Sequence, residues 1–211
     1  MIKLTKLNKP DVLVQNEAEW TSLLLKKIAA GEIPTTTEKS RYRHPQIKAT
    51  LIQETFGKCA YCESKLEHIT YGDIEHISPK STELESIFQW ENLTLACDVC
   101  NTNKGDKFPG KEGLVDPYDN DPGERFQIHG PIIYAVPGDN DARYTEVTLD
   151  LNRVPLLERR RDKMKYLRDM VEAVAAASDR LRPTLIEALK LEAEPDQEFS
   201  AIAKKYLSEY V

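Results

Sequence analysis

Residues 59–62 read Cys-Ala-Tyr-Cys and residues 97–100 read Cys-Asp-Val-Cys, and these two pairs contain all four cysteines of the chain. Two residues between thiolates allow one tight turn to present both sulfurs to the same ion, and two such turns complete the tetrahedron that zinc prefers. Because four thiolates fill every position, we expect a structural Zn²⁺ that clamps the two ends of this segment together. A redox-active pair or unrelated buried thiols are the alternatives, and two pairs around one compact segment disfavour both. The predicted zinc ligands are Cys59, Cys62, Cys97 and Cys100.

A second pattern lies between and after the cysteine pairs. Glu75 directly precedes His76, Asn92 follows 16 residues after His76, and Asn101 follows the last cysteine. Together with the cysteines, this arrangement over about residues 58–108 resembles the HNH (ββα-metal) endonucleases. The resemblance implies a zinc-stapled ββα core and metal-dependent hydrolysis of phosphodiester bonds.

The resemblance also assigns roles to single residues. His76 is similar to the general-base histidine, and Asn92 to the asparagine that shapes the loop and orients the base. Glu75 stands at the first metal-ligand position and Asn101 at the last, so both are expected to bind the catalytic ion. Glutamate is longer than the commoner residues at the first position, and asparagine is a weak neutral ligand. We therefore expect a loosely held hard cation at this second site.

The chemistry of these residue types agrees with those roles. An imidazole with a pKa near ~6.5 suits a general base at neutral pH. Carboxylate and amide oxygens are ligands that Mg²⁺ or Mn²⁺ accepts while keeping water and substrate oxygens in the other positions. Basic side chains nearby are expected to meet backbone phosphates, with plain surface solvation as the alternative. These nucleic-acid-binding candidates are Lys80, Lys104 and Lys107.

Several further polar residues have a weaker claim to function. Asp73 could assist Glu75 through water but is interpreted as an ordinary turn carboxylate. His68 is expected to be structural or exposed rather than a ligand, and it is the next histidine to test if His76 is not the base. The basic segment 39–43 and the arginine run 159–161 are each compatible with nucleic-acid contact or with solvation.

The hydrophobic pattern predicts an α+β fold in which the zinc-stapled core lies between helical flanks. Helices are expected from Asn16 to Gly31 and from Pro45 to Gly57. The core is expected to contain a hairpin over 66–77, a strand over 92–95 and a short helix after Cys100. A hairpin is expected over 126–136 with its turn at His129-Gly130, followed by helices over 155–178, 179–194 and 196–211. The predicted divisions are a basic helical flank (1–57), the nuclease core (58–112), a loop-rich segment (113–154) and a helical region (155–211).

Composition limits the class of protein. The 211 residues include 29 Lys and Arg against 35 Asp and Glu, which gives a net charge of −6. No apolar run approaches the roughly 20 residues that span a bilayer, and residues 1–12 lack the features of a signal peptide, so we expect a cytoplasmic protein. The acidic total predicts poor unaided capture of nucleic acid, because such affinity comes largely from Lys and Arg.

Weaker similarity extends past the core to Leu114–Tyr118 and to Leu151-Asn152-Arg153. There the sequence resembles one HNH subfamily, the nuclease subunits of Septu-type anti-phage systems, which also occur beside some retrons. The resemblance implies an ABC/SMC-like ATPase partner of the PtuA type and a role in defence against phage. The chain has no glycine-rich phosphate-binding loop, so any use of ATP must come from a partner. Part of the apolar stripe after Pro155 is expected to dock that partner, and the rest to pack on the core.

We expect hydrolysis of DNA by an endonuclease. One alternative keeps the fold and makes RNA, for example tRNA, the substrate. A second alternative is a zinc-held binding module without catalysis. The presence of all four HNH residues argues against that second alternative: Glu75, His76, Asn92 and Asn101.

Overall fold

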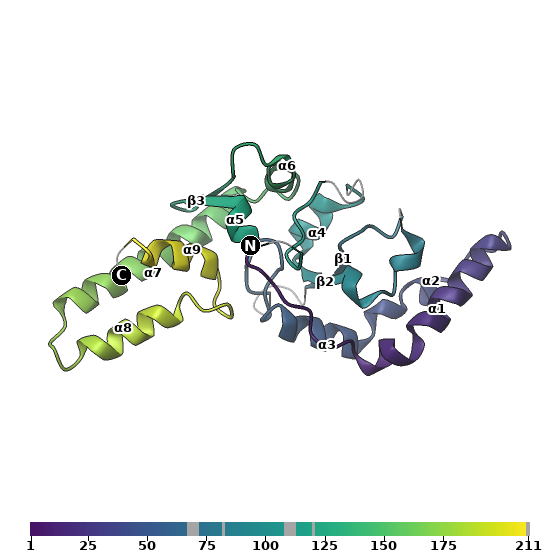
Figure 1. Ribbon diagram of the computed structural model, residues 1–211, viewed down its shortest axis with the longest axis horizontal. Helices are drawn as coiled ribbons and strands as arrows, with labels where there is room; N and C mark the ends of the chain where they lie inside the picture. The colour runs from purple at the N-terminus through teal and green to yellow at the C-terminus, as the bar shows by residue number, and fades with distance from the viewer. Residues whose placement is uncertain (67–71, 82, 108–112, 120, 210–211) are drawn as a thin grey trace.

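The computed structural model describes residues 1–66, 72–81, 83–107, 113–119 and 121–209. The chain is elongated, with the N-terminal helices at one end, the C-terminal helices at the other and a small sheet with its helix between them (Figure 1). The two antiparallel sheets in the described part of the chain have two strands each, and helices make up most of the remainder. The α+β fold predicted from the sequence is therefore confirmed.

The centre of the molecule is a ββα unit. Strand β1 (Asp73–His76) pairs antiparallel with β2 (Leu93–Ala96), with His76 opposite Leu93. Helix α4 (Asp98–Lys104) follows β2 directly and contacts β1. The strand predicted over 92–95 and the short helix near Cys100 are both present, although α4 begins before Cys100. Residues 67–71, which would form most of the first arm of the hairpin expected over 66–77, lie outside the described residues.

The N-terminal flank is more helical than predicted. Helix α1 (Asp11–Ala29) begins directly after Pro10 rather than at Asn16, because its first turn already buries Leu13 in the core. A capping box between Thr35 and Glu38 starts the short helix α2 (Thr36–Lys39), which is not among the helices expected from the sequence. The 3₁₀ turn η1 (Arg41–Arg43) leads into α3 (Pro45–Glu54), which ends three residues before Gly57.

The loops around the second half of the core also contain short elements. Two 3₁₀ turns, η2 (Leu84–Ser86) and η3 (Trp90–Asn92), lie between β1 and β2. The predicted second hairpin is present as β3 (Phe126–His129) and β4 (Ile132–Ala135), with Gly130 and Pro131 between the strands. Helices α5 (Pro122–Arg125) and α6 (Asn140–Thr148) interrupt the segment expected to be mostly loop, and Asp121 and Asp139 cap them.

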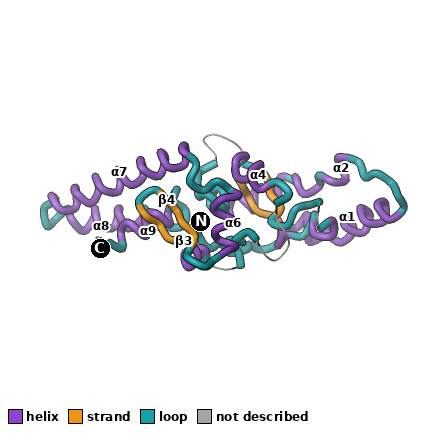
Figure 2. Tube along the Cα trace, turned by 90° about the horizontal axis from the view of Figure 1, so that it is seen from above, coloured by secondary structure: helices purple, strands orange, loops and turns teal. Residues whose placement is uncertain are grey.

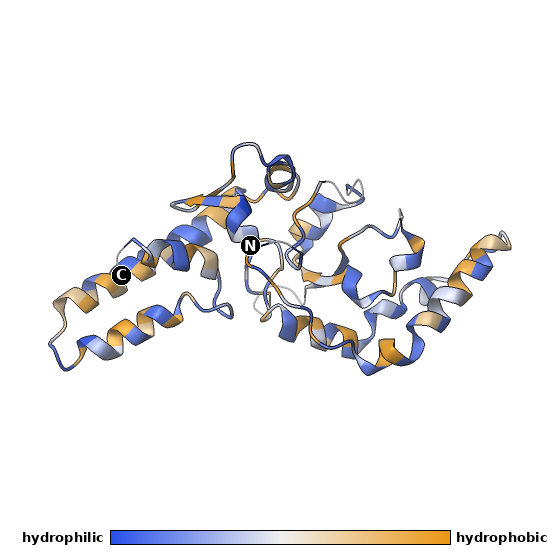
Figure 3. Cartoon of the chain, viewed as in Figure 1, coloured by the Kyte–Doolittle hydropathy of each residue, from blue (hydrophilic) through white to orange (hydrophobic). Residues whose placement is uncertain are grey.

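The C-terminal region forms a second, smaller apolar cluster. Helix α7 (Val154–Ala176) leaves the core and packs against α8 (Arg182–Leu191) and α9 (Ser200–Leu207), side by side in both views (Figures 1 and 2). Each helix is amphipathic, with its apolar residues in short patches between polar ones (Figure 3). Leu156 and Met164 of α7 pack on the main core, whereas Leu167 and its neighbours pack on α8 and α9. Most of the apolar stripe after Pro155 is therefore covered by the chain itself.

The main core joins all the regions of the chain. The indole nitrogen of Trp90 donates to the carbonyl of Leu7 at 2.8 Å, which ties the N-terminal segment to the ββα unit. Tyr118 donates to Glu54 at 2.6 Å and contacts the hydroxyl of Thr94 at 2.8 Å, which ties the segment after the core to α3 and β2. Within the described part of the chain, no helix combines the length and apolar character that crossing a bilayer requires.

Candidate metal centre and active site

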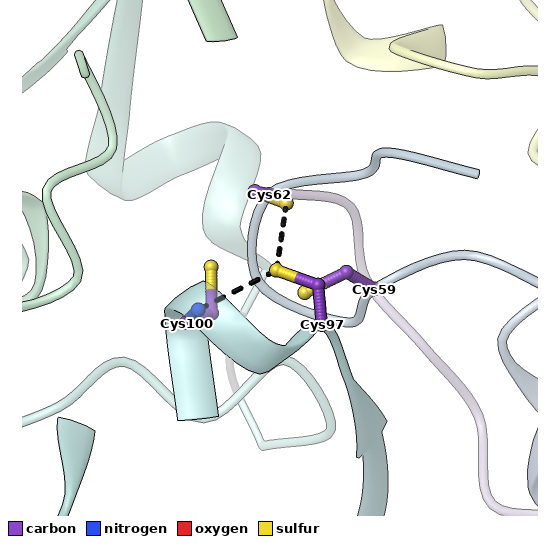
Figure 4. Close-up of side chains that lie close together, drawn as sticks. All are labelled: Cys59, Cys62, Cys97 and Cys100. Atoms are coloured by element: carbon purple, nitrogen blue, oxygen red, sulfur yellow. Dashed lines mark hydrogen bonds between the residues drawn. The ribbon is translucent and has the colours of Figure 1, made fainter. Parts of the chain in front are cut away.

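The four cysteines come together from two separate turns. Cys59 and Cys62 lie in the loop after α3, while Cys97 caps the start of α4 and Cys100 lies in its first turn (Figure 4). Their sulfur atoms all lie within 4.8 Å of one another. The backbone of Ala60 donates to the carbonyl of Leu95 at 2.9 Å, so the first turn is fixed to β2.

The chemistry of this cluster fits zinc. Four thiolates at such separations can surround one ion, and soft sulfur donors favour zinc over magnesium or calcium. Cys97 Sγ already accepts a hydrogen bond from the backbone of Cys100 at 3.4 Å, which orients the second pair. With four sulfurs present, the cluster leaves no position for a substrate, as expected of a structural centre.

A pocket of about 220 Å³ lies at the end of β1. It brings together side chains of one strand end, one turn and one helix, and five of the site residues expected from the sequence line it. Asn92 and Lys107 do not line it. The pocket is lined by Tyr42, Arg43, Asp73, Ile74, Glu75, His76, Pro79, Lys80, Asn101, Lys104, Gly105 and Asp106.

His76 is held in one orientation. Its Nε2 lies 3.0 Å from the carbonyl oxygen of Ile87, and its ring meets the ring of Tyr42 edge-on at 4.5 Å between centroids. A carbonyl oxygen can only accept, so Nε2 carries the hydrogen and Nδ1 keeps the lone pair. The side chain is almost fully buried, and this burial lowers the pKa of His76 to about 4. The imidazole is therefore neutral at pH 7 and can accept a proton.

Asn92 fixes the loop that holds His76. Its Oδ1 accepts from the backbone of Ser78 at 2.7 Å, and its Nδ2 donates to the carbonyls of Ser78 and Ser86 at 3.1 Å each. Ser86 immediately precedes Ile87, the residue whose carbonyl receives the His76 hydrogen bond. One buried amide thus joins the chain after β1 to the turn that orients the imidazole.

Glu75 is paired with a lysine from α4. Lys104 Nζ lies 2.7 Å from Glu75 Oε1 and also donates to the carbonyl of His76 at 2.7 Å. The Lys104 side chain is 1 % exposed and that of Glu75 is 9 % exposed, so Lys104 is not the solvated surface residue that the alternative interpretation described. Burial raises the pKa of Glu75, and the charge of Lys104 opposes that rise.

The other expected site residues are more open. Asn101 lines the pocket and donates from Nδ2 to Asp73 at 2.9 Å, so its amide oxygen is the acceptor that this group keeps. Lys80 donates to the hydroxyl of Tyr42 at 3.0 Å, and the exposed Lys107 donates to the carbonyl of Asn103 at 3.3 Å. His68 lies outside the described residues.

Tyr42 and Arg43 line the pocket but were not assigned to the site from the sequence. Tyr42 is buried against His76, and Arg43 is an exposed neighbour that lines the same pocket. The sequence signal was the basic segment 39–43 with a tyrosine inside it. Nothing in that segment predicted that it would cross from the N-terminal flank to the end of β1.

Comparison with known proteins identifies the central unit. Residues 59–107 match the family model described as HNH endonuclease. The chain contains an HNH endonuclease domain. This HNH domain spans the two cysteine pairs and the ββα unit, and the predicted nuclease class is confirmed.

The similarity continues outside the HNH domain. The Septu protein PtuB of Bacillus thuringiensis is 28 % identical over 223 residues, which cover 98 % of this chain and 82 % of that protein. The Septu protein PtuB of Bacillus mycoides strain KBAB4 is 28 % identical over 164 residues, which cover 61 % of this chain and 55 % of that protein. The flanks of the HNH domain are thus similar to those of PtuB proteins, as the sequence resemblance implied.

The ion pair inside the HNH domain leads to a stability prediction. Lys104→Met should lower the free energy of unfolding by about 3–5 kcal/mol, because it leaves the buried carboxylate of Glu75 without its cation. Urea titration followed by circular dichroism measures this change. Lys107→Met is the matched control, since Lys107 lies on the surface three residues further along. Equal stability of the Lys104 variant and the wild type would show that the pair contributes nothing.

Proposed function

We propose that the chain is a metal-dependent endonuclease that hydrolyses DNA phosphodiester bonds at the pocket around His76. The observation that carries the proposal is the state of that histidine. It lies in a pocket lined by two oxygen donors, Glu75 and Asn101, and its hydrogen bond to Ile87 leaves Nδ1 as a proton acceptor. A phosphodiester bound in this pocket with a water molecule would therefore meet the proton acceptor and the metal ligands together.

The chain's own residues divide the work of the reaction. His76 would take a proton from the attacking water at Nδ1, while Tyr42 and the Ile87 carbonyl keep the ring from turning. Asn92 would act as a positioning residue through the Ser78 and Ser86 loops. Proton transfer by a positioned base typically contributes about 10²–10⁴ in rate.

The donor set suits a hard divalent cation. Within the described residues, no second group of three His, Cys, Asp or Glu ligands stands close enough to hold an ion besides the four cysteines. Glu75 and Asn101 line one pocket and offer oxygen ligands, so they would hold Mg²⁺ or Mn²⁺ together with water and substrate oxygens, which is how magnesium is commonly bound. When bound, the ion neutralises charge on the phosphate and the leaving oxygen. Zn²⁺ is the proposed occupant of the four-cysteine cluster.

Basic residues at the pocket wall would contact the nucleic-acid backbone. Arg43 and Lys80 are exposed and line the pocket, and Lys107 lies on the surface after α4, outside the pocket lining. The cation of Lys104 is buried and already paired with Glu75, so Lys104 would contribute through that ion pair and not at the surface. Basic side chains that meet phosphates release counterions, so binding through them weakens as salt rises.

The two basic residues that line the pocket surface, Arg43 and Lys80, lead to a prediction on substrate binding. Arg43→Gln and Lys80→Gln should each raise KM and make the salt dependence of binding shallower by about one unit of log–log slope. Cleavage of a labelled duplex at several salt concentrations measures both effects. Arg180→Gln, an exposed arginine between α7 and α8 that belongs to no candidate binding segment, should change neither. If Arg43→Gln and Lys80→Gln both kept the wild-type salt dependence of binding, the nucleic-acid backbone would not contact these two residues.

A substrate panel separates DNA from the alternatives. The purified chain with Mg²⁺ or Mn²⁺ is offered duplex DNA, single-stranded DNA and tRNA in parallel. We expect cleavage of DNA that chelation abolishes. Preferential cleavage of tRNA would favour the RNA nuclease, and binding without cleavage of any substrate would favour a zinc-held binding module.

The similarity to Septu proteins supports a cellular role and a partner. We propose that the chain is the nuclease of a cytoplasmic anti-phage system and acts with an ABC/SMC-like ATPase of the PtuA type. A net charge of −6 and the absence of a phosphate-binding glycine loop favour delivery to DNA by such a partner. The apolar face of α7 supports this less than expected, because α8 and α9 cover much of it.

Co-purification tests the partnership. The tagged chain and the product of a neighbouring ATPase gene are expressed together and purified by the tag. We expect a complex that survives gel filtration and binds nonspecific duplex more tightly than the isolated chain at physiological salt. Tight binding by the isolated chain together with no complex would leave a free-standing nuclease.

A further inference from the structure

Arg153 lies directly on the cysteine cluster. Its guanidinium nitrogens are 3.7 Å from Cys62 Sγ, 3.7 Å from Cys100 Sγ and 3.8 Å from Cys97 Sγ. It thus reaches three of the four sulfurs from a loop more than 50 positions further along the chain. Among the described residues, no carboxylate lies within ion-pair distance of Arg153. The sulfurs are therefore its anionic neighbours.

The negative charge expected on the zinc-loaded cluster explains why a guanidinium lies beside it. Four thiolates around Zn²⁺ carry a net charge of about −2, and three of the cysteines here are buried. A buried charge is costly unless a partner compensates it. A planar guanidinium can donate several hydrogen bonds at once, which suits a residue that spans three sulfur atoms.

The loop that carries Arg153 is fixed on both sides. The amide of Asn152 pairs with the backbone of Ile133 in β4, accepting at 3.0 Å and donating at 2.7 Å. The buried Arg160 of α7 donates to the carbonyl of Leu151 at 2.7 Å. Arg153 itself donates to the carbonyls of Leu149 and Asp150 at 3.4 and 3.2 Å. The guanidinium is held in place by the segment between α6 and α7 rather than by the HNH domain.

We propose that Arg153 is a positioning residue of the metal centre, which compensates the charge of the zinc-bound thiolates from outside the HNH domain. The Leu151-Asn152-Arg153 motif would then work as one unit, in which Leu151 and Asn152 fix the loop and Arg153 meets the sulfurs. The proposal rests on zinc in the four-cysteine cluster and not on DNA cleavage.

Zinc release tests the proposal without any nuclease assay. The purified zinc-loaded chain is mixed with the chromogenic chelator 4-(2-pyridylazo)resorcinol, and the rate and extent of zinc transfer are recorded. Loss of a group that supports metal ligands from outside typically costs about 10–100-fold in metal affinity. We expect Arg153→Gln to weaken zinc binding in that range and Arg153→Lys, which keeps the charge without the planar fork, to recover part of it.

Two controls separate compensation of charge from fastening of the loop. Asn152→Ala removes the pairing with Ile133 but no charge, so it should lower the melting temperature and leave zinc affinity near the wild-type value. Arg161→Gln, a surface arginine on α7, should change neither. The proposal is overturned if Arg153→Gln holds zinc as tightly as the wild type, or if Asn152→Ala releases zinc as readily as Arg153→Gln. If Arg153→Gln does not fold, Arg153→Lys against Asn152→Ala gives the same comparison.

Discussion

Replacing His76 by alanine should reduce DNA cleavage by about 10²–10⁴-fold, because the reaction loses its proton acceptor. The variant should still fold and keep its zinc, since the cysteine cluster does not include His76. The change does remove the contact with Tyr42 and the hydrogen bond to Ile87, so a small fall in melting temperature is expected. Cleavage rates under single-turnover conditions, with zinc content and circular dichroism on the same samples, measure all three.

Two further variants make the His76 result specific. His76→Gln retains a group that can donate to the Ile87 carbonyl but supplies no basic imidazole nitrogen, so it should be as inactive as the alanine variant. His129→Ala removes an exposed histidine on β3 and should cleave at the wild-type rate. A His76→Ala variant with wild-type activity would assign the base to another group, and His68 would be tested next.

Replacing Cys97 by serine should release the metal and unfold or aggregate the HNH domain. Binding free energy at a structural zinc is folding free energy, with apparent values of about 10–16 kcal/mol in zinc-finger peptides. Cys97 also caps α4 through the backbone of Cys100, and a serine hydroxyl can accept the same hydrogen bond, so the expected loss comes from the missing zinc ligand and not from the cap. Metal analysis by mass spectrometry and thermal melting followed by circular dichroism measure the loss.

Val99→Ser is the matched control for the cysteine variant. Val99 lies between Cys97 and Cys100 and is 45 % exposed, so serine there adds a hydroxyl to the same turn without removing a thiolate. Its zinc content should stay near one ion per chain. Wild-type stability and zinc content in Cys97→Ser would mean that the four sulfurs do not clamp the domain.

The clustering of the cysteines could be predicted from the sequence because the spacing of a few residues determines it. Two turns of the form Cys-x-x-Cys can hold one ion only if their sulfurs meet, and they do. The strand before His76 and the helix after Cys97 follow from the same local pattern. Such short-range constraints do not depend on how the rest of the chain folds.

The residues that the sequence did not reveal are placed by long-range packing. Tyr42 reaches His76 from the N-terminal flank, and Arg153 reaches the cysteines from the loop after α6. Their neighbours in the sequence are ordinary helix and loop residues, so no periodicity or spacing indicated a contact. Lys104 was expected to meet phosphate, but the return of α4 against β1 buries it beside Glu75. The early start of α1 has the same cause, because the buried side chain of Leu13 adds a turn that local propensity did not predict.

Metal add-back tests the central claim most directly. The purified chain is treated with EDTA to remove loosely held ions, its zinc content is measured, and cleavage of a labelled DNA duplex is followed as Mg²⁺ or Mn²⁺ is restored. We predict no cleavage after chelation and full recovery with the added ion while about one zinc per chain stays in place, and no recovery in His76→Ala. Cleavage that persists at full rate without added ion, or that returns equally in His76→Ala, would contradict an active site built on His76, Glu75 and Asn101.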